Sequence, residues 1–334
     1  MFKATQESIE DLFEWASSEG RCVFAGDDSL QRLLYRHVGD GYITQPWKGL
    51  FALKEDWEKL SPCEQTRRIV KSLSLKHPSW IFYGATAATM FGLEVASSAL
   101  RPLQLATTRR SYLARNDGRI EWHLLKNRET ELVDGVLVTC FDPTLLDCLG
   151  SLGFRHALAI ADSALRVHNM KKSDLLALAK AYTGDGNRQQ VLDVANWANS
   201  LAANGGESVA RAVMIEQGFM VPQLQVKIPD LIDGGVYYAD FKWDLPDGTC
   251  VVGELDGLDK YVDPQMTGGR SVLRVMADER RRESRIGAAG MRVMRFSYSE
   301  VLDTERFCRL LETYGIPRGP ARPNGHYEAG HGRL

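Results

Sequence analysis

The stretch "YYADFKWDLPDGTCVVGELDG", Tyr237–Gly257, determines the fold expected for the last third of the chain. Residues 235–243 and 250–256 are rich in Val, Tyr, Phe and Trp, the residue types that favour β-strands. Between them, "LPDGT" contains the Pro-Asp-Gly combination that is typical of tight turns. The sequence therefore predicts a β-hairpin at this point.

The register of this hairpin decides which side chains meet. If the turn centres near Asp247, residues placed symmetrically about it lie opposite each other, so that Asp240 faces Glu254. Because side chains alternate between the two faces of a strand, one face carries Asp240, Lys242, Glu254 and Asp256. The other face carries Phe241, Trp243, Val251 and Leu255, and we expect it to be core.

Two like charges directly opposed across a hairpin are destabilising, and a cation between them reverses the sign of the interaction. Hard divalent ions such as Mg²⁺ or Mn²⁺ take carboxylate and water oxygens as ligands. Asp240 and Glu254 therefore predict a metal site. The alternative is a pair of acids on a solvated strand face, and a shift of one residue in the turn would separate them.

The composition limits the class of protein. A chain of 334 residues is long enough for two or three domains, and its net charge of −2 means that any affinity for nucleic acid must come from local basic patches. The six cysteines are scattered without a CxxC pair, which argues against a zinc site and for a reducing compartment. No apolar run reaches about 18 residues, so we expect a cytoplasmic protein without a membrane partner.

The first region, 1–60, combines short helical patterns with a hairpin. "TQESIEDLFEWASSEG" predicts an amphipathic helix, "GDDSLQRLLYRHVGDGYI" predicts a second one capped by Asp28 or Ser29, and "YITQPWKGLFAL" predicts two short strands. This order suggests a winged helix, in which Arg32 and Arg36 of the second helix and Lys48 of the wing would contact DNA. The alternative is a small helical cap that contacts only protein.

Three further regions are expected: 61–203 as a middle α/β domain, 204–314 as a sheet flanked by helices in the order αβββαβ, and 315–334 as a flexible tail. Within the middle domain, "DPTLLDCLGSLGFRHALAIADSALR" (142–166) has a strongly helical pattern, with Asp142 as the candidate cap before Pro143. Single acids such as Asp147 and Asp162 are expected on helix surfaces or at caps. The whole chain is thus expected to be a mixed α+β (α/β) protein.

Residues 270–295 form a basic segment. It holds eight arginines against three acids, a net charge of +5 in a protein whose total is −2. Such an excess favours binding to phosphates, with Arg280, Arg281 and Arg285 as candidates. The alternative is a helix face on which Arg pairs with Glu three or four residues away.

The last third resembles the PD-(D/E)XK nuclease superfamily, in particular the branch of the very-short-patch repair endonuclease and its uncharacterised relatives. The resemblance covers about 110 residues and rests on "GESVARAVMIEQGFMVPQLQV", "ADFKW", "VVGELDGLDKY" and "ADERRRESRIGAAGMRVMRFSYSEV" in this order. It implies a restriction-endonuclease-like fold and Mg²⁺-dependent hydrolysis of DNA phosphodiester bonds. Asp240 and Glu254 match metal-binding acids, Glu207 matches an accessory acid that completes the metal site, and Gln225 matches a polar residue of the intervening strand.

The chain departs from the superfamily at its usual lysine. The position two beyond Glu254 is Asp256, and the following helix carries Arg280 in a run where relatives have Lys. Lys242 and Lys260 are the nearby lysines that could stabilise developing charge, and Asp256 could join the metal shell or orient water. Arginine cannot act as a base, but it can hold a phosphate with two hydrogen bonds.

Residues 1–200 resemble the abortive-infection antitoxin family of type IV toxin–antitoxin systems. The likeness rests on "GYITQPWKGLFAL", "FYGATAATMFGL" and "LVTCFDPTLLDCLGSLGFRHALAIADSALR". It implies an N-terminal winged helix, promoter binding and a cognate toxin as partner. Two functions are therefore expected to compete: a metal-dependent endonuclease targeted by a winged helix, with a role in phage defence, and a DNA-binding regulator or antitoxin with a degenerate nuclease domain. A plain protein-interaction scaffold is a third, weaker alternative.

Overall fold

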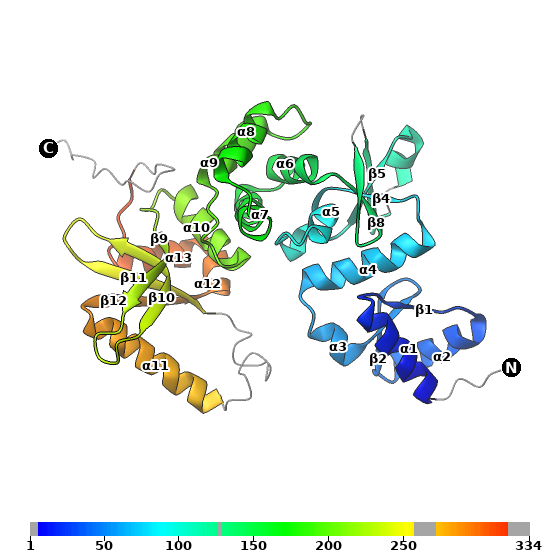
Figure 1. Ribbon diagram of the computed structural model, residues 1–334, viewed down its shortest axis with the longest axis horizontal. Helices are drawn as coiled ribbons and strands as arrows, with labels where there is room; N and C mark the ends of the chain where they lie inside the picture. The colour runs from blue at the N-terminus through cyan, green and yellow to red at the C-terminus, as the bar shows by residue number, and fades with distance from the viewer. Residues whose placement is uncertain (1–5, 116, 126–128, 257–271, 320–334) are drawn as a thin grey trace. The chain divides into compact units, whose positions relative to one another are not determined.

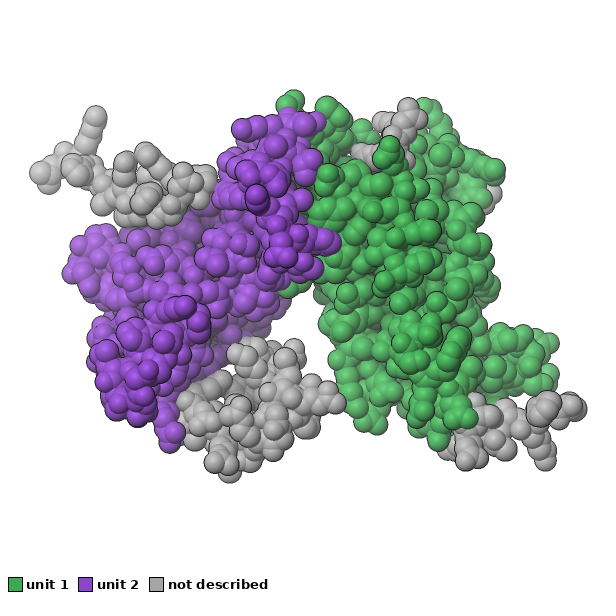
Figure 2. Space-filling view, viewed as in Figure 1, with its two compact units in different colours: residues 1–152, 182–188 green, residues 153–181, 189–334 purple. Residues whose placement is uncertain are grey.

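The chain is divided into two compact units in a computed structural model that describes residues 6–115, 117–125, 129–256 and 272–319. The first unit consists of residues 1–152 and 182–188, and the second of residues 153–181 and 189–334 (Figure 2). The described residues form a mixed α+β protein with sheets of three, five and four strands. Among them, no helix combines the length and the apolar character that a membrane crossing requires. The boundary at 152/153 falls inside the region 61–203, and the domain limits expected at 60 and 203 stay predictions.

The N-terminal part of the first unit is a three-stranded antiparallel sheet with helices (Figure 1). Its elements are α1 (Gln6–Ser18), β1 (Val23–Phe24), α2 (Asp28–Gly39), β2 (Ile43–Trp47), β3 (Leu50–Leu53) and α3 (Lys54–Glu58). The strands lie in the order β1-β3-β2, and Phe13, Leu34 and Phe51 belong to the core beneath them. The expected cap of the second helix is wrong by one residue, because the carboxylate of Asp27 accepts the Leu30 N–H at 2.7 Å.

The β2–β3 hairpin presents its turn to solvent. Gly49 has φ 76°, a left-handed conformation that glycine adopts without steric cost, and this explains the tight connection between the strands. Lys48 is exposed beside it. The hairpin expected from "YITQPWKGLFAL" is thus confirmed, with its turn at Lys48 and Gly49.

The remainder of the first unit is a mixed five-stranded sheet of order β6-β5-β4-β8-β7 with helices. Its elements are α4 (Pro62–Lys76), β4 (Ile81–Phe82), α5 (Gly84–Met90), β5 (Leu103–Thr107), β6 (Ile120–Leu124), β7 (Thr130–Val133), β8 (Val136–Thr139), α6 (Phe141–Ser151) and the short 3-10 helices Ser97–Ala99 and Arg110–Arg115. A capping box of Ser61 and Glu64 begins α4. Asp147, expected on a helix surface or cap, is instead buried and accepts the hydroxyls of Tyr83 at 2.7 Å and Tyr182 at 3.1 Å.

The helical pattern over 142–166 corresponds to two helices. α6 ends at Ser151 and α7 (Phe154–Val167) begins after Gly153. Both Leu152 and Gly153 have extended backbone angles, and a glycine costs about 1 kcal/mol relative to alanine inside a helix. The first of the two helices is preceded by Cys140 rather than capped by Asp142.

The second unit contains a four-stranded sheet of order β12-β11-β10-β9 between two helical layers (Figure 1). Its elements are α7, α8 (Lys172–Ala181), α9 (Arg188–Trp197), α10 (Gly205–Glu216), β9 (Gln223–Pro229), β10 (Val236–Asp244), β11 (Cys250–Asp256), α11 (Val272–Ala288), β12 (Met291–Ser297), α12 (Tyr298–Leu302) and α13 (Thr304–Thr313). Helices α10, α12 and α13 pack on one face of the sheet. Ile286 of α11 packs on the other face. The αβββαβ order expected for 204–314 is the order of elements in this sheet and its helices.

The register of the β10–β11 hairpin is the expected one. Phe241 pairs with Gly253 and Trp243 with Val251, so that residues symmetric about Asp247 face each other. Gly253 makes this pairing possible, because a Cβ there would lie 2.9 Å from the Trp243 ring. Phe241, Trp243 and Val251 are fully buried in the main core of the unit, as expected for that face.

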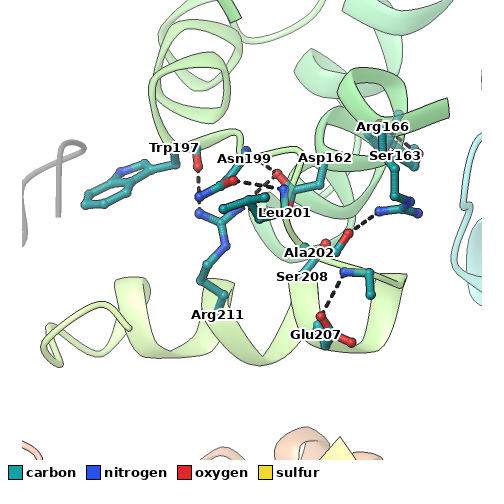
Figure 3. Close-up of polar contacts among 12 residues, drawn as sticks. Asp162, Ser163, Arg166, Trp197, Asn199, Leu201, Ala202, Glu207, Ser208 and Arg211 are labelled. Atoms are coloured by element: carbon teal, nitrogen blue, oxygen red, sulfur yellow. Dashed lines mark hydrogen bonds and ion pairs between the residues drawn. The ribbon is translucent and has the colours of Figure 1, made fainter. Parts of the chain in front are cut away.

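A buried ion pair ties α7 to α10 (Figure 3). The Arg211 guanidinium donates to both carboxylate oxygens of Asp162, at 2.7 and 2.8 Å, and to the Trp197 carbonyl at 2.7 Å. The side chains of Asp162 and Arg211 are 0% and 3% exposed. The carboxylate also accepts the Asn199 N–H at 2.7 Å, so Asp162 is a core residue and the expectation of a surface or cap position is wrong.

We expect Arg211→Met to lower the free energy of unfolding by about 3–5 kcal/mol, because it leaves the buried Asp162 carboxylate without its cation. Urea denaturation followed by far-UV circular dichroism measures this loss. Arg309→Met is the matched control, since Arg309 pairs with Glu305 at an exposed site where about 0–1 kcal/mol is at stake. Equal effects of the two substitutions would contradict the importance of the buried pair.

Candidate functional site

The buried side chains of β9 and of β10 switch from one face of the sheet to the other at the same position. In a regular strand, residues an even number apart lie on the same face. Yet Leu224 and Phe241 belong to the core under α10, whereas Ile228 and Ala239 belong to the cluster under α11.

The irregularity lies at Gln225, which has φ 49°, a left-handed conformation that is uncommon for residues other than glycine. The ladder pairs Ala239 with Val226 and Phe241 with Leu224, so Gln225 and Asp240 lie between these two pairs on neighbouring strands. Outliers of this kind cluster at functional sites, which makes this point the candidate site.

Gln225 bridges two acids. Its amide Nε2 donates to Glu207 Oε2 at 3.2 Å and to Asp240 Oδ1 at 3.4 Å. The other oxygen of Asp240 accepts the Leu255 N–H at 2.9 Å, a side-chain bond that anchors Asp240 to the neighbouring strand β11. Three residues that the sequence predicted for one site, namely Glu207, Gln225 and Asp240, are therefore together.

Glu207 is positioned by the start of α10. The side chain of Asn204 caps this helix by accepting the Glu207 N–H at 3.0 Å, and it donates to Glu207 Oε1 at 2.8 Å. The Ala203 N–H donates to Glu207 Oε2 at 2.8 Å (Figure 3). Burial raises the pKa of Glu207 to about 7, and the charge of Asp240 adds to this effect, whereas the hydrogen bonds from Ala203 and Gln225 oppose it.

Glu254 is engaged by an arginine of α11. The Arg282 guanidinium lies 2.9 Å from Glu254 Oε1, and it also donates to the Tyr238 carbonyl. The Glu254 side chain is only 13% exposed. The sequence predicted a metal ion between Asp240 and Glu254. In the structure, the Arg282 guanidinium already balances the charge of Glu254.

Asp256 and Lys242 are likewise paired. Arg295 of β12 donates to Asp256 through Nε, at 3.1 Å and 3.2 Å to its two oxygens, and through its terminal nitrogen. Lys242 donates to both oxygens of Asp244, at 2.6 and 2.8 Å. Lys260, the remaining lysine expected here, lies outside the described residues.

The other arginines of α11 differ in their surroundings. Arg280 and Arg281 are exposed, whereas Arg285 pairs with Asp233 at 2.8 Å. The first two are accessible to a phosphate backbone, and the third is held against the loop between β9 and β10.

In the first unit, the three residues expected to contact DNA are all exposed: Arg32, Arg36 and Lys48. Arg32 donates through Nε to the Asp28 carbonyl at 3.2 Å, one turn earlier in α2. Tyr35, on the same helix, accepts a hydrogen bond from Gln45 of β2 at 3.1 Å, which links the helix to the hairpin. These positions are free of the core and could meet a partner.

The acids of the site differ in how well they suit a divalent ion. Among the residues that the structure describes, no three His, Cys, Asp or Glu side chains gather as a metal-ligand group. Mg²⁺, however, is usually bound by one or two carboxylates and completes its shell with water and phosphate oxygens. Glu207 and Asp240, two carboxylates joined only by a neutral amide, fit such an ion, whereas Glu254 does not while Arg282 is bound to it.

Sequence reasoning missed Arg282 and Arg295 as partners of the two β11 acids. The basic composition of 270–295 gave a signal for arginine, but it could not indicate which of them pair inward. The register of β11 and β12 alone would not have identified the pairs, because it places Glu254 beside Arg295, whereas Arg295 bonds Asp256 and Glu254 bonds Arg282 of α11.

Comparison with protein-family models, curated proteins and solved structures finds no match to this chain. Its function is therefore inferred from the side chains and geometry described above.

The raised pKa of Glu207 makes unfolding pH-dependent. Between pH 4.5 and about 7 the folded state holds a proton that the unfolded state releases. The stability that this proton contributes is therefore complete below pH 4.5 and is lost as the pH rises through 7. Its size is about 1.4 kcal/mol per unit of pKa difference.

We expect Asp240→Asn to lower the Glu207 pKa by removing the nearby charge, and Asp244→Asn to leave it unchanged. Carbon-13 NMR titration of the carboxyl group measures this pKa; a wild-type value near 4.5 would contradict the assignment.

Proposed function

We propose that the C-terminal part of this protein is a Mg²⁺- or Mn²⁺-dependent nuclease that hydrolyses DNA phosphodiester bonds. The observation that carries the proposal is the pair of acids, Glu207 and Asp240, bridged by Gln225 at a left-handed backbone position. Two like charges held this closely, one of them buried, favour a cation as their third partner. Nucleases use such pairs to bring a metal to the scissile phosphate.

The order of elements supports the same proposal. A helix with an acid in its first turn, three antiparallel strands, a helix and a strand parallel to β11 is the arrangement expected for a restriction-endonuclease-like domain. In the first unit, α1, β1, α2 and the β2–β3 hairpin are consistent with a winged helix. Both assignments belong to the proposal.

The residues of the site take distinct roles in this proposal. Glu207 and Asp240 hold the ion, which when bound supplies charge neutralisation and an acidified water. Gln225 orients both carboxylates, and the Leu255 N–H fixes Asp240 against β11. Arg282 and Arg295 supply the positive charge that lysine supplies in the superfamily, and each is bonded to one acid of β11, Glu254 or Asp256.

The proposed substrate contacts lie on both units. The exposed Arg280 and Arg281 bind the phosphate backbone near the site, while Arg32, Arg36 and Lys48 bind duplex DNA through the winged helix. A targeting module joined to a nuclease domain is compatible with a role in phage defence.

Asp240→Asn is expected to reduce cleavage at least about 100-fold, because it removes one of two ligands of a weakly chelated ion. Nicking of supercoiled plasmid in Mg²⁺ or Mn²⁺ measures this rate. Asp244→Asn, a change of the same chemistry on the same strand at an exposed position, should leave the rate within about twofold of wild type. Cleavage by Asp240→Asn at the wild-type rate would remove this residue from the mechanism.

A second function, a DNA-binding regulator or antitoxin with a cognate toxin as partner, is favoured by a specific observation. Glu254 and Asp256 are both neutralised by arginines, and Lys242 is held by Asp244. A domain with these acids occupied could keep the fold and the DNA affinity without catalysis.

For the regulator, binding to the DNA upstream of its own coding sequence should persist in EDTA and weaken with salt. We expect Arg32→Ala and Arg36→Ala each to reduce the slope of log K against log salt by about 0.9, the change expected for one lost phosphate contact. Fluorescence anisotropy measures the slope, and Arg309→Ala, an exposed arginine of α13, is the control. Loss of binding on chelation of metal would argue against a regulator.

A further inference from the structure

The first unit contains a pocket to which neither proposed function assigns a ligand, although Lys48 at its edge is also one of the proposed DNA contacts. It is a cavity of about 140 Å³ bounded by the tip of the β2–β3 hairpin, β1, the C-terminal end of α4 and the start of β6. Its floor is apolar, formed by the buried Leu73 and the partly buried Phe24 and Ile120, which pack on the core of the unit.

Aromatic rings form the walls of this pocket. His77 and Trp80 are stacked with their centroids 3.9 Å apart and an interplanar angle of 8°. Trp122, outside the lining, packs edge-on against Trp80 at 5.9 Å, and Trp47 of the hairpin contributes a further ring to the lining. Because Trp47 and Trp80 both pack against the core, their rings are held in place before any ligand arrives.

The rim of the pocket is positively charged. It carries Lys48, Lys76 and Arg119 against a single acid, Asp117. Asp117 is already occupied: it accepts the N–H groups of Arg119 and Ile120, both at 3.0 Å, and pairs with the Arg119 guanidinium at 3.2 Å.

The two lysines are exposed, and the ion pairs found among the described residues include neither of them. Burial and the charge of Lys76 lower the pKa of His77, so its imidazole is neutral at pH 7. A neutral imidazole can donate one hydrogen bond to a ligand or accept one from it.

We infer that this pocket binds a single nucleotide, with the base against Trp47 and Trp80 and the phosphate at Lys48 and Lys76. An apolar cavity walled by fixed rings suits a flat aromatic group, and two uncompensated ammonium groups at its mouth suit an anion attached to that group. A base inside a duplex has both faces covered by its neighbours. The ligand is therefore a free nucleotide or an unpaired nucleotide of a strand.

The test uses the full-length chain and isothermal titration calorimetry with four probes: dTMP, thymidine, a 5′-phosphorylated oligo-dT and a blunt duplex. We expect saturable binding of dTMP and about tenfold weaker binding of thymidine. Trp80→Leu and Lys76→Glu should each weaken dTMP binding about tenfold or more, as expected for the loss of a stacked base or of a phosphate contact. Tighter binding of the oligonucleotide than of dTMP identifies a strand as the source of the nucleotide, and equal binding identifies the free nucleotide.

Two controls match the test variants. Trp15→Leu removes an exposed tryptophan of α1, and Lys171→Glu reverses an exposed lysine of the second unit; both should change dTMP affinity by less than about twofold. Lys76 is exposed, so Lys76→Glu remains informative if Trp80→Leu fails to fold. Equal affinity for thymidine and dTMP, binding of the duplex alone, or wild-type dTMP affinity in folded Lys76→Glu would each overturn the inference.

Discussion

The buried ion pair between Asp162 and Arg211 is the constraint on which the second unit depends. It lies almost entirely outside water and is completed by the Trp197 carbonyl and the Asn199 N–H, so it fixes α7, α10 and the segment between α9 and α10 in one arrangement. Glu207 is one helical turn before Arg211 on α10. The direction in which Glu207 meets Gln225 and Asp240 is therefore set by a charge pair that belongs to the core.

The unit balances its other acids in different ways, and this difference is the basis of the proposed function. Glu254 and Asp256 receive guanidinium groups from α11 and β12, while Glu207 and Asp240 share one neutral amide. Burial raises the pKa of Glu207 to about 7, so this carboxyl group gains and loses its proton near neutral pH. In the proposed nuclease, a bound divalent cation replaces this proton as the partner of the pair. The same logic explains why a nuclease and a regulator built on this unit would differ in electrostatics rather than in fold.

Local chemistry in the sequence was enough to predict much of the second unit. Pro-Asp-Gly set the turn and hence the pairing of Phe241 with Gly253, and hydrophobic periodicity predicted the order of helices and strands. That Glu207 and Gln225 would join Asp240 was expected only from the family resemblance, and the structure brings these three residues together. Contacts between distant segments were not predictable: Arg282 reaches Glu254 across 28 residues, and Arg211 reaches Asp162 across 49. The cap at Asp27 was missed because its neighbour Asp28 offers the same local signal.

The left-handed residue Gln225 in β9 limits how the paired strands β9 and β10 can change in evolution. On either side of Gln225 and Asp240 the two strands anchor to different helical layers, one half under α10 and the other under α11. A slip by two residues, which an ordinary amphipathic strand tolerates because it restores the same face, would here push part of each apolar set into the wrong layer. The strands are thus pinned at their midpoint, so length variation is confined to their ends: the turn near Asp247 and the loop that precedes β10.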